Sequence, residues 1–357
     1  MKIGILTFCN AFNLGGALQA FSLQKALEET SQAAELIDYR CQAIENMHKL
    51  RPVFHGKISL KSRVYNIIHN IAFFPRRVRY KKFQRTAKRS RKYTRENIKE
   101  ANGLYDMFIT GSDQVFNLKL TGDDSTYYLD FVDKGIKASY AASLGIYLPD
   151  QKERYQQYLE SFDYLSVREN STAEIFEKEL GIEAAVMPDP VFLHTSEEWT
   201  KLVGVSKANK HKYVLVYSLI ENEELYAIAN KVAKEKNLKV FAITKVLRPM
   251  GRADKYLRNT GPKEFIELVA NADYVVTNSF HGTAFSIIFE KQFTTLMPPV
   301  APERICDLLQ VTELSERIYN GESISLAEIN YSQRSESIRS MKLLGEQYLR
   351  HVLGRKE

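Results

Sequence analysis

The sequence has few of the residues that mark redox, metal-binding or membrane proteins. Its three cysteines, Cys9, Cys41 and Cys306, lie far apart without zinc or disulfide spacing. No pair of histidines or carboxylates has metal-motif spacing, so we expect neither a metal nor a cofactor. No stretch approaches the roughly 18 apolar residues of a membrane span. The apolar run at the N-terminus is too short for a signal peptide, so we expect a cytoplasmic protein.

Glycine-rich phosphate motifs are also absent. The chain has neither the Gly-x-Gly-x-x-Gly spacing of a dinucleotide fold nor the Gly-Lys-Ser of a phosphate loop. This absence disfavours nicotinamide-dependent and P-loop enzymes.

One segment makes the chain basic. The net charge is +7, yet eleven lysines and arginines and no acids lie between Arg76 and Arg95. Without these eleven, 39 basic residues would face 43 acidic ones. The apolar stretch Val64–Pro75 comes just before, and an apolar stretch followed by a basic one is typical of an interfacial membrane contact. A solvated helix face is the alternative. No zinc spacing, heptad or aromatic RNA-binding pattern supports nucleic acid as a partner.

Short apolar runs that alternate with helical patterns predict parallel sheets. With 357 residues, the chain is long enough for two domains. We expect an α/β fold with two doubly wound, Rossmann-like domains facing across a cleft, as in the two-domain GT-B glycosyltransferases. The expected parts are an N-terminal domain over 1–195 with a basic, helical insert at about 47–100, a C-terminal domain over 196–330, and a closing amphipathic helix over 331–357.

The segment Ala272–Phe289 holds the most informative pattern. A buried strand, Tyr274–Thr277, runs into Asn278-Ser279-Phe280-His281-Gly282-Thr283, and helix-compatible residues follow. This arrangement is where an open α/β sheet presents its ligand groups. His281 can exchange protons near neutral pH, and a helix N-terminus favours an anion. The alternative is an ordinary capped turn with a surface histidine.

Other strand ends supply further candidates. Asp113 could be a general base or a turn cap. Arg168 could hold a phosphate or carboxylate, or form a structural ion pair with Glu169 or Asp163. Arg304 could reach an anion or lie at the surface. The other candidate binding residues are polar or glycine positions in these loops: Asn13, Gly15, Gly16, Ser112, Gln114, Ser143, Asn278, Ser279, Gly282 and Thr283.

Six motifs in order resemble the polysaccharide pyruvyl transferase family. They are Gly4–Phe8 with Asn13–Gln19, Phe108–Asn117, Ser139–Gly145, Ser166–Glu169, Pro188–Phe192 and Thr277–Thr283. The resemblance spans about Lys2 to Leu309. The chain has Phe116 where the family pattern has Trp, and Leu14-Gly15-Gly16 where an aromatic residue or Asp often follows the first Asn.

The resemblance implies transfer of the enolpyruvyl group of phosphoenolpyruvate to two hydroxyls of a hexose. The products would be a pyruvate ketal and phosphate. Arg168 and Arg304 would hold the donor, His281 would transfer a proton or stabilise the leaving phosphate, and Asp113 would act as base. The acceptor would be a sugar of a capsule or exopolysaccharide precursor, with a lipid-linked oligosaccharide as one candidate. The Arg76–Arg95 run would then dock the enzyme on the anionic inner face of the plasma membrane.

Two other functions fit the same residues. A nucleotide-sugar glycosyltransferase would use the same architecture but release a nucleoside diphosphate. A non-catalytic carbohydrate-binding module would keep the grooves without needing a proton-exchanging histidine.

Overall fold

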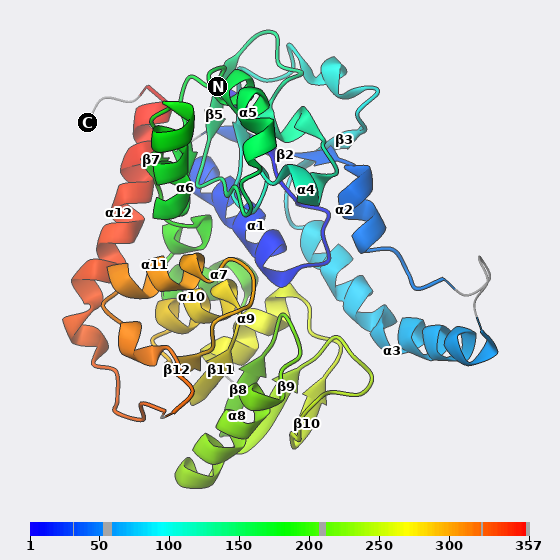
Figure 1. The fold of residues 1–357 in the computed structure, drawn as a ribbon, viewed down its shortest axis with the longest axis vertical. Helices are drawn as coiled ribbons and strands as arrows, with labels where there is room; N and C mark the ends of the chain where they lie inside the picture. The colour runs from blue at the N-terminus through cyan, green and yellow to red at the C-terminus, as the bar shows by residue number, and fades with distance from the viewer. Residues whose placement is uncertain (31, 53–58, 207–211, 323, 355–357) are drawn as a thin grey trace. The chain divides into compact units, whose positions relative to one another are not determined.

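The chain divides into two compact units. A computed structural model describes residues 1–30, 32–52, 59–206, 212–322 and 324–354. Unit 1 comprises Met1–His48, Gln84–His194 and Arg339–Glu357, and unit 2 comprises Lys49–Phe83 and Thr195–Ile338. Each unit contains one five-stranded parallel sheet (Figure 1).

The two sheets have the same topology. In unit 1 the order is β3-β2-β1-β4-β5, and in unit 2 it is β10-β9-β8-β11-β12. The strands of the first sheet are β1 (Lys2–Leu6), β2 (Ala33–Tyr39), β3 (Arg89–Tyr93), β4 (Met107–Thr110) and β5 (Ile136–Ser139). Those of the second are β8 (Tyr213–Tyr217), β9 (Lys239–Ile243), β10 (Lys255–Leu257), β11 (Tyr274–Thr277) and β12 (Gln292–Thr295). The strand order reverses between β1 and β4 and between β8 and β11, and ligands bind at such switch points.

A short pair of parallel strands, β6 (Ser166–Val167) and β7 (Ala185–Val186), continues the first sheet. Ala142, which follows β5, bridges to Val167. The residues after β6 therefore belong to the same carboxyl edge as those after β1 and β4.

The helices connect and cover these strands. The α-helices are α1 (Leu14–Glu29), α2 (Gln42–Met47), α3 (Leu60–Gln84), α4 (Leu118–Thr121), α5 (Lys152–Leu159), α6 (Asn170–Ile175), α7 (Ser196–Val203), α8 (Glu223–Lys236), α9 (Pro262–Ala270), α10 (Phe280–Ile288), α11 (Glu303–Val311) and α12 (Ser335–Val352). Short 3-10 turns occupy Ile98–Ala101, Ser125–Tyr128, Pro149–Gln151, Pro190–Leu193, Ser315–Arg317 and Tyr331–Gln333, and a π turn occupies Phe176–Leu180. None of the helices in the described part of the chain is both long and apolar enough to cross a bilayer.

Apolar side chains join each sheet to its helices. In unit 1, Leu23 of α1 and Leu349 of α12 share a buried cluster with Ile3 and Ile5 of β1. The close packing of α12 requires a small residue, because a Cβ on Gly345 would lie 2.4 Å from the Tyr140 hydroxyl. The closing amphipathic helix expected over 331–357 is thus present as α12, and it belongs to unit 1 from Arg339 onward.

In unit 2, helix α8 covers one face of the sheet. Ile228 and Val232 share a buried cluster with Val214 of β8 and Val240 of β9. Separate aromatic contacts join α7, α9 and α10, with the rings of Trp199 and Phe285 centred 5.1 Å apart.

The α/β class with parallel, doubly wound sheets is confirmed. The strand expected at Tyr274–Thr277 is present as β11 with the same bounds, whereas β3 and β10 do not follow from apolar runs in the sequence. The insert expected to be helical over about 47–100 is helical in α3 only as far as Gln84, and Arg89–Tyr93 pairs with β2 instead. The division also differs from the expected one, because Lys49–Phe83 groups with unit 2.

Candidate functional site

The switch point of unit 1 brings together the loops after β1 and β4. Asn13 caps α1, since its side chain accepts a hydrogen bond from the Gly15 N–H at 3.1 Å. A Cβ on Gly16 would lie 3.2 Å from Oδ2 of Asp113. Asn13, Gly15 and Gly16 therefore shape the helix start against which the Asp113 carboxylate lies.

The loop after β4 is held by buried hydrogen bonds. The Ser112 N–H donates to Gln19 Oε1 at 3.0 Å, and the Ser112 hydroxyl donates to the Ala141 carbonyl at 2.8 Å. Asp113 has a left-handed backbone with φ 74°, a conformation that few residues other than glycine adopt. Its Oδ1 accepts from the Gln114 N–H at 2.9 Å, and the side chain is half-buried. This fixed backbone presents a carboxylate that a ligand can still reach.

Ser143 completes this part of the edge. Its N–H donates to the Asp113 carbonyl at 2.9 Å. Its hydroxyl is buried and has no hydrogen-bond partner in the part of the chain that the structure describes. An unsatisfied buried hydroxyl beside Asp113 is a plausible contact for a polar ligand.

Arg168, which follows β6, is buried among acids. Its Nη1 donates to Asp189 Oδ2 at 2.7 Å and its Nε to Glu169 Oε1 at 3.0 Å. Burial alone would lower the pKa of this guanidinium, but the carboxylates around it, including Asp113, outweigh burial and raise that pKa. Of the two roles left open by the sequence, this geometry favours the structural ion pair with Glu169. Asp163 instead accepts from the Lys137 N–H.

The switch point of unit 2 carries the histidine motif. Asn278 follows β11 and fixes the loop after β8, since it accepts from the Leu219 N–H and donates to the Ile220 carbonyl, both at 2.9 Å. Ser279 caps α10, and its hydroxyl accepts from the Gly282 N–H at 3.4 Å. The predicted strand, turn and helix start are therefore present, although α10 begins at Phe280, so that His281 lies inside its first turn.

Gly282 and Thr283 pack the start of α10 onto the sheet. A Cβ on Gly282 would lie 2.3 Å from Thr277 Oγ1 and 3.0 Å from Tyr217 Cδ1. Thr283 bonds with the Thr295 hydroxyl at 3.0 Å. These two residues set the position of the helix, and their side-chain positions face protein rather than open space.

His281 and Arg304 occupy the first turns of neighbouring helices. His281 is buried, with its ring edge-on to Phe280 at 5.2 Å between centroids. Arg304 is half-buried in the first turn of α11, which packs against α10. The structure thus places both residues in unit 2, whereas Asp113 and Arg168 lie in unit 1.

Two further side chains reach the unit 2 edge without having been singled out from the sequence as site residues. Arg76 of α3 is buried, and so is the hydroxyl of Tyr217 at the end of β8. Arg76 belongs to a run of charges, and Tyr217 to an apolar strand. Neither context distinguishes a ligand contact from an ordinary residue.

A cavity of about 430 Å³ opens beside Asn278. Its lining includes Glu221, Glu223, Met250 and Met297, with no lysine or arginine among the residues that form it. Such a lining suits a neutral, hydroxyl-bearing group better than an anion. In the described residues, no cluster of three or more His, Cys, Asp or Glu side chains could hold a metal ion.

The fold and the two switch points define an α/β protein of the GT-B type. The chain is similar to UDP-GlcNAc 2-epimerase from Rickettsia bellii, with 11% identity, a TM-score of 0.53, and 99% of this chain and 96% of that chain covered. It is also similar to the enzyme of the same name from Neisseria meningitidis, with 11% identity, a TM-score of 0.51, and 99% of each chain covered. At these identities the likeness shows the fold alone.

The family follows from the sequence itself. The model of the polysaccharide pyruvyl transferase family matches residues 13–298, and the chain belongs to that family. This membership supports a transferase of polysaccharide biosynthesis. No curated protein matches the sequence.

Proposed function

We propose that the protein transfers the enolpyruvyl group of phosphoenolpyruvate to two hydroxyls of one hexose in a polysaccharide precursor. The observation that carries the proposal is the His281 turn at the switch point of unit 2, within the region matched by the pyruvyl transferase family. Protonation of the vinyl CH₂ makes the central carbon electrophilic. One hydroxyl adds to that carbon and gives its proton to a base. The C–O bond to phosphate then breaks, and the second hydroxyl adds and loses its proton to the leaving phosphate, which gives the ketal.

His281 is the proposed proton-transfer residue for the donor. Histidine is the side chain whose ordinary pKa best suits proton exchange near neutral pH. Its place in the first turn of α10 puts it beside backbone N–H groups and the positive end of the helix dipole, which favour an anionic substrate. His281 could therefore protonate the CH₂ group or stabilise the departing phosphate.

Asp113 is the proposed base for the sugar. Its carboxylate is half-buried in a loop whose backbone is fixed on both sides, which favours a set position for an attacking hydroxyl. The acids around Arg168 leave this region poor in free positive charge, so it suits a neutral sugar better than the donor. The proposal therefore assigns the donor to residues of unit 2 and the sugar to residues of unit 1.

The test is phosphate release from phosphoenolpyruvate in the presence of nucleotide-linked and lipid-linked hexosides. Acceptor-dependent release, with a product heavier by one pyruvate ketal, would support the proposal. Nucleoside diphosphate release from a nucleotide sugar, with none from phosphoenolpyruvate, would replace it with a glycosyltransferase. The cavity beside Asn278 is the observation that favours this second function, because its carboxylates could accept hydrogen bonds from sugar hydroxyls.

A lipid-linked acceptor would require contact with a membrane, and α3 offers a suitable surface. Its exposed apolar residues recur every three or four positions and so form one stripe: Leu60, Val64, Ile67, Ile68, Ile71, Phe74 and Val78. Ile71 is 69% exposed and Phe74 60% exposed. The helix contains seven lysines and arginines and no acid. An exposed apolar stripe on a cationic helix is typical of binding to the surface of an anionic bilayer.

The contact would differ from the one expected over Arg76–Arg95. Arg76 is buried, and Arg79, Arg89 and Arg95 form ion pairs with Glu264, Asp38 and Asp124. The apolar stripe of α3, with Lys61, Lys81 and Lys82 exposed on the same helix, is therefore the better candidate.

Vesicle flotation tests this surface. The wild type should float with phosphatidylglycerol vesicles at low salt, and Ile71→Glu should not. Leu343→Glu is the matched control, because Leu343 is an exposed apolar residue on another helix, α12. Equal flotation of Ile71→Glu and wild type would contradict the proposal, and so would equal binding to neutral vesicles.

A further inference from the structure

Helix α3 contributes a buried arginine to the carboxyl edge of the second sheet. Arg76 is 7% exposed. Its Nη2 donates to the Tyr80 hydroxyl at 3.2 Å, and its guanidinium carbon lies 5.5 Å from the centre of that ring. Within the described residues no carboxylate pairs with it. A buried cation without a counter-ion destabilises the fold by several kcal/mol, so the burial of Arg76 needs an explanation.

A second cation lies near Arg76. Lys245, in the segment after β9, has its pKa lowered to about 8, first by burial and then by the charge of Arg76. No carboxylate of the described chain forms an ion pair with this lysine either. The charges of Arg76 and Lys245 repel each other, and a bound anion would relieve that repulsion.

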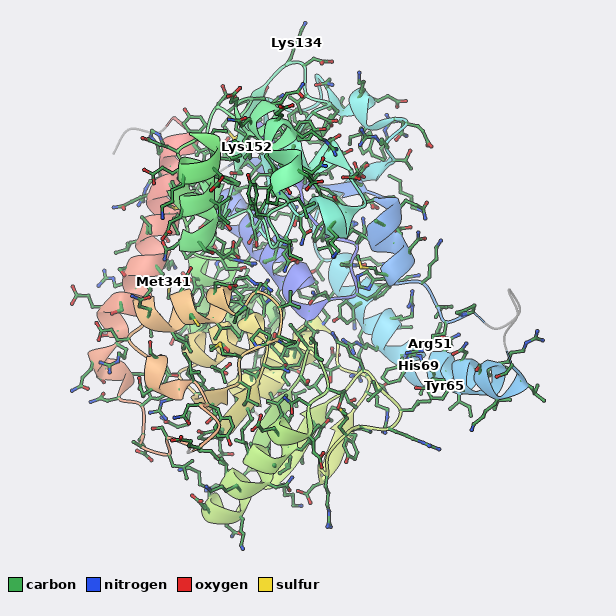
Figure 2. The ribbon with its side chains drawn as sticks, viewed as in Figure 1. Arg51, Tyr65, His69, Lys134, Lys152 and Met341 are labelled. Carbon is green, nitrogen blue, oxygen red and sulfur yellow. The ribbon has the colours of Figure 1, made fainter. Side chains whose placement is uncertain are left out.

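The same helix fixes the segment that carries Lys245. The Lys245 backbone forms a hydrogen bond with His69 of α3, two turns before Arg76. Burial and then the charge of Arg51 lower the pKa of His69, and the Lys245 contact offsets part of that shift. The rings of His69 and Phe73 lie 4.5 Å apart, and Arg51 lies over the Tyr65 ring at 5.6 Å (Figure 2). Helix α3 therefore carries Arg76 itself, and through His69 it also holds the segment that carries Lys245.

The buried hydroxyl of Tyr217, at the end of β8, belongs to the same edge of the second sheet. Tyr217 is 1% exposed, and its hydroxyl makes no hydrogen bond of normal geometry within the described part of the chain. Burial raises the pKa of this phenol, as does Tyr80, whereas Arg76 and the Ser279 hydroxyl lower it. The Tyr217 ring lies against the start of α10, because a Cβ on Gly282 would be 3.0 Å from Tyr217 Cδ1. Its hydroxyl is close enough to Arg76 and to the Ser279 hydroxyl for both to lower its pKa.

We propose that Arg76, Lys245 and Tyr217, with the N-terminus of α10, form a binding site for a phosphate group. Two cations, a hydroxyl donor and a helix N-terminus suit a dianion with several acceptor oxygens better than a single carboxylate. The guanidinium supplies directional donors, and the ammonium supplies a compact charge. If the proposed function holds, the phosphate is that of the donor, bound on the helix turn that carries His281. That last assignment rests on the proposed function, but phosphate binding itself does not.

Binding of inorganic phosphate and of phosphoenolpyruvate tests the site. Calorimetric titration should show binding to the wild type that weakens about ten- to a hundredfold in Arg76→Gln and in Lys245→Met, the usual cost of losing a charged hydrogen bond. Lys234→Gln and Lys231→Met, both exposed on α8, are the matched controls and should bind like the wild type. Unchanged affinity in Arg76→Gln and Lys245→Met would overturn the proposal.

The ligand-free variants separate binding from a structural role. Removing one of two unpaired cations should leave the Tm of the free protein unchanged or raise it, while phosphate no longer stabilises the protein. A structural residue would give the opposite result, a lower Tm with the phosphate-induced increase retained. That outcome would overturn the proposal.

Proton uptake gives a readout independent of activity. Phosphate should raise the pKa of Lys245 from about 8, so that binding at pH 8.5 takes up a fraction of a proton. At that pH His69 stays neutral, and Tyr80 and Tyr217, with their raised pKa values, stay protonated. Titrations in buffers of different ionisation enthalpy should show this uptake in the wild type and not in Lys245→Met. Equal uptake in both would contradict the role of Lys245.

The site and the proposed function can fail separately. Phosphate binding that depends on Arg76 and Lys245, without turnover of phosphoenolpyruvate, would support the site and remove the donor assignment. Turnover with an unchanged KM for phosphoenolpyruvate in both variants would support the function and overturn the site.

Discussion

Two arginines at corresponding edges of the two sheets have opposite surroundings. Arg168 in unit 1 is buried against Asp189 and Glu169, with Asp113 nearby. Arg76 in unit 2 is equally buried, but its neighbours are Lys245 and two tyrosines, Tyr80 and Tyr217.

The different surroundings of Arg168 and Arg76 indicate which of the two regions can hold an anion. An arginine whose charge is balanced by two carboxylates has little left for a phosphate, whereas unbalanced cations at a helix N-terminus favour one. The residue type alone therefore says less about function than the sign of the charges around it. This comparison assigns the donor to unit 2 and the sugar hydroxyls to unit 1.

The largest expected effect comes from the two proposed proton-transfer residues. His281→Ala and Asp113→Asn should each reduce phosphate release by about 10²- to 10⁴-fold, the usual contribution of general acid–base catalysis. The two variants should differ in their affinity for the donor, because His281→Ala should weaken phosphoenolpyruvate binding and Asp113→Asn should not. Steady-state kinetics and calorimetric titration measure the two effects. Wild-type turnover in either folded variant would remove that residue from the mechanism.

Arg168→Ala should cause the next largest effect, on stability. Removing the arginine leaves the buried carboxylates of Asp189 and Glu169 without the positive charge that balances them, and breaking a buried ion pair costs about 3–5 kcal/mol. Arg154→Ala, which breaks the exposed pair with Asp123, should cost no more than about 1 kcal/mol. Urea denaturation measures both. Similar stabilities in the two variants would contradict the structural role of Arg168. If Arg168→Ala instead lost phosphate binding without losing stability, Arg168 would be a donor-binding residue.

Lys245→Met should give the smallest effect, with the opposite sign. The folded protein binds the Lys245 proton less tightly than the unfolded chain, because the folded pKa is about 8 rather than 10.5. The charged lysine therefore destabilises the fold below pH 8, and stability contributed by this group rises as pH increases from about 8 to 10.5. At pH 7 the variant should be more stable by on the order of 1–2 kcal/mol after allowance for its partial exposure.

The pH dependence of unfolding checks that sign. The difference between Lys245→Met and wild type should shrink as pH rises through 8 to 10, while Lys231→Met should show no such trend. A variant that is less stable than the wild type at pH 7 would mean that Lys245 has a stabilising partner.

Much of the fold could be predicted from the sequence. Central strands such as β8 and β11 are short apolar runs that end in polar loops, and the strand expected at Tyr274–Thr277 has the observed bounds of β11. The two missed strands, Arg89–Tyr93 and Lys255–Leu257, are edge strands. Edge strands carry charges because one side faces solvent, so their sequences lack the apolar pattern on which the prediction depends.

The site was less predictable, because charge balance depends on distant residues. Asp189 lies 21 residues from the arginine that it pairs with. The burial of Arg76 depends on helix α3 grouping with unit 2, which no local pattern indicates. Asn13 and Ser279 were expected as substrate contacts, and the structure shows each as a helix cap, a role that the same residue types perform.

Phosphate release from phosphoenolpyruvate tests the central claim most directly. The measurement compares wild type, Arg76→Gln and the control Lys234→Gln across a panel of nucleotide-linked and lipid-linked hexosides. We predict acceptor-dependent release by the wild type and Lys234→Gln, and a KM for phosphoenolpyruvate raised at least about tenfold in Arg76→Gln. No release from phosphoenolpyruvate with any acceptor, together with nucleoside diphosphate release from a nucleotide sugar, would contradict it.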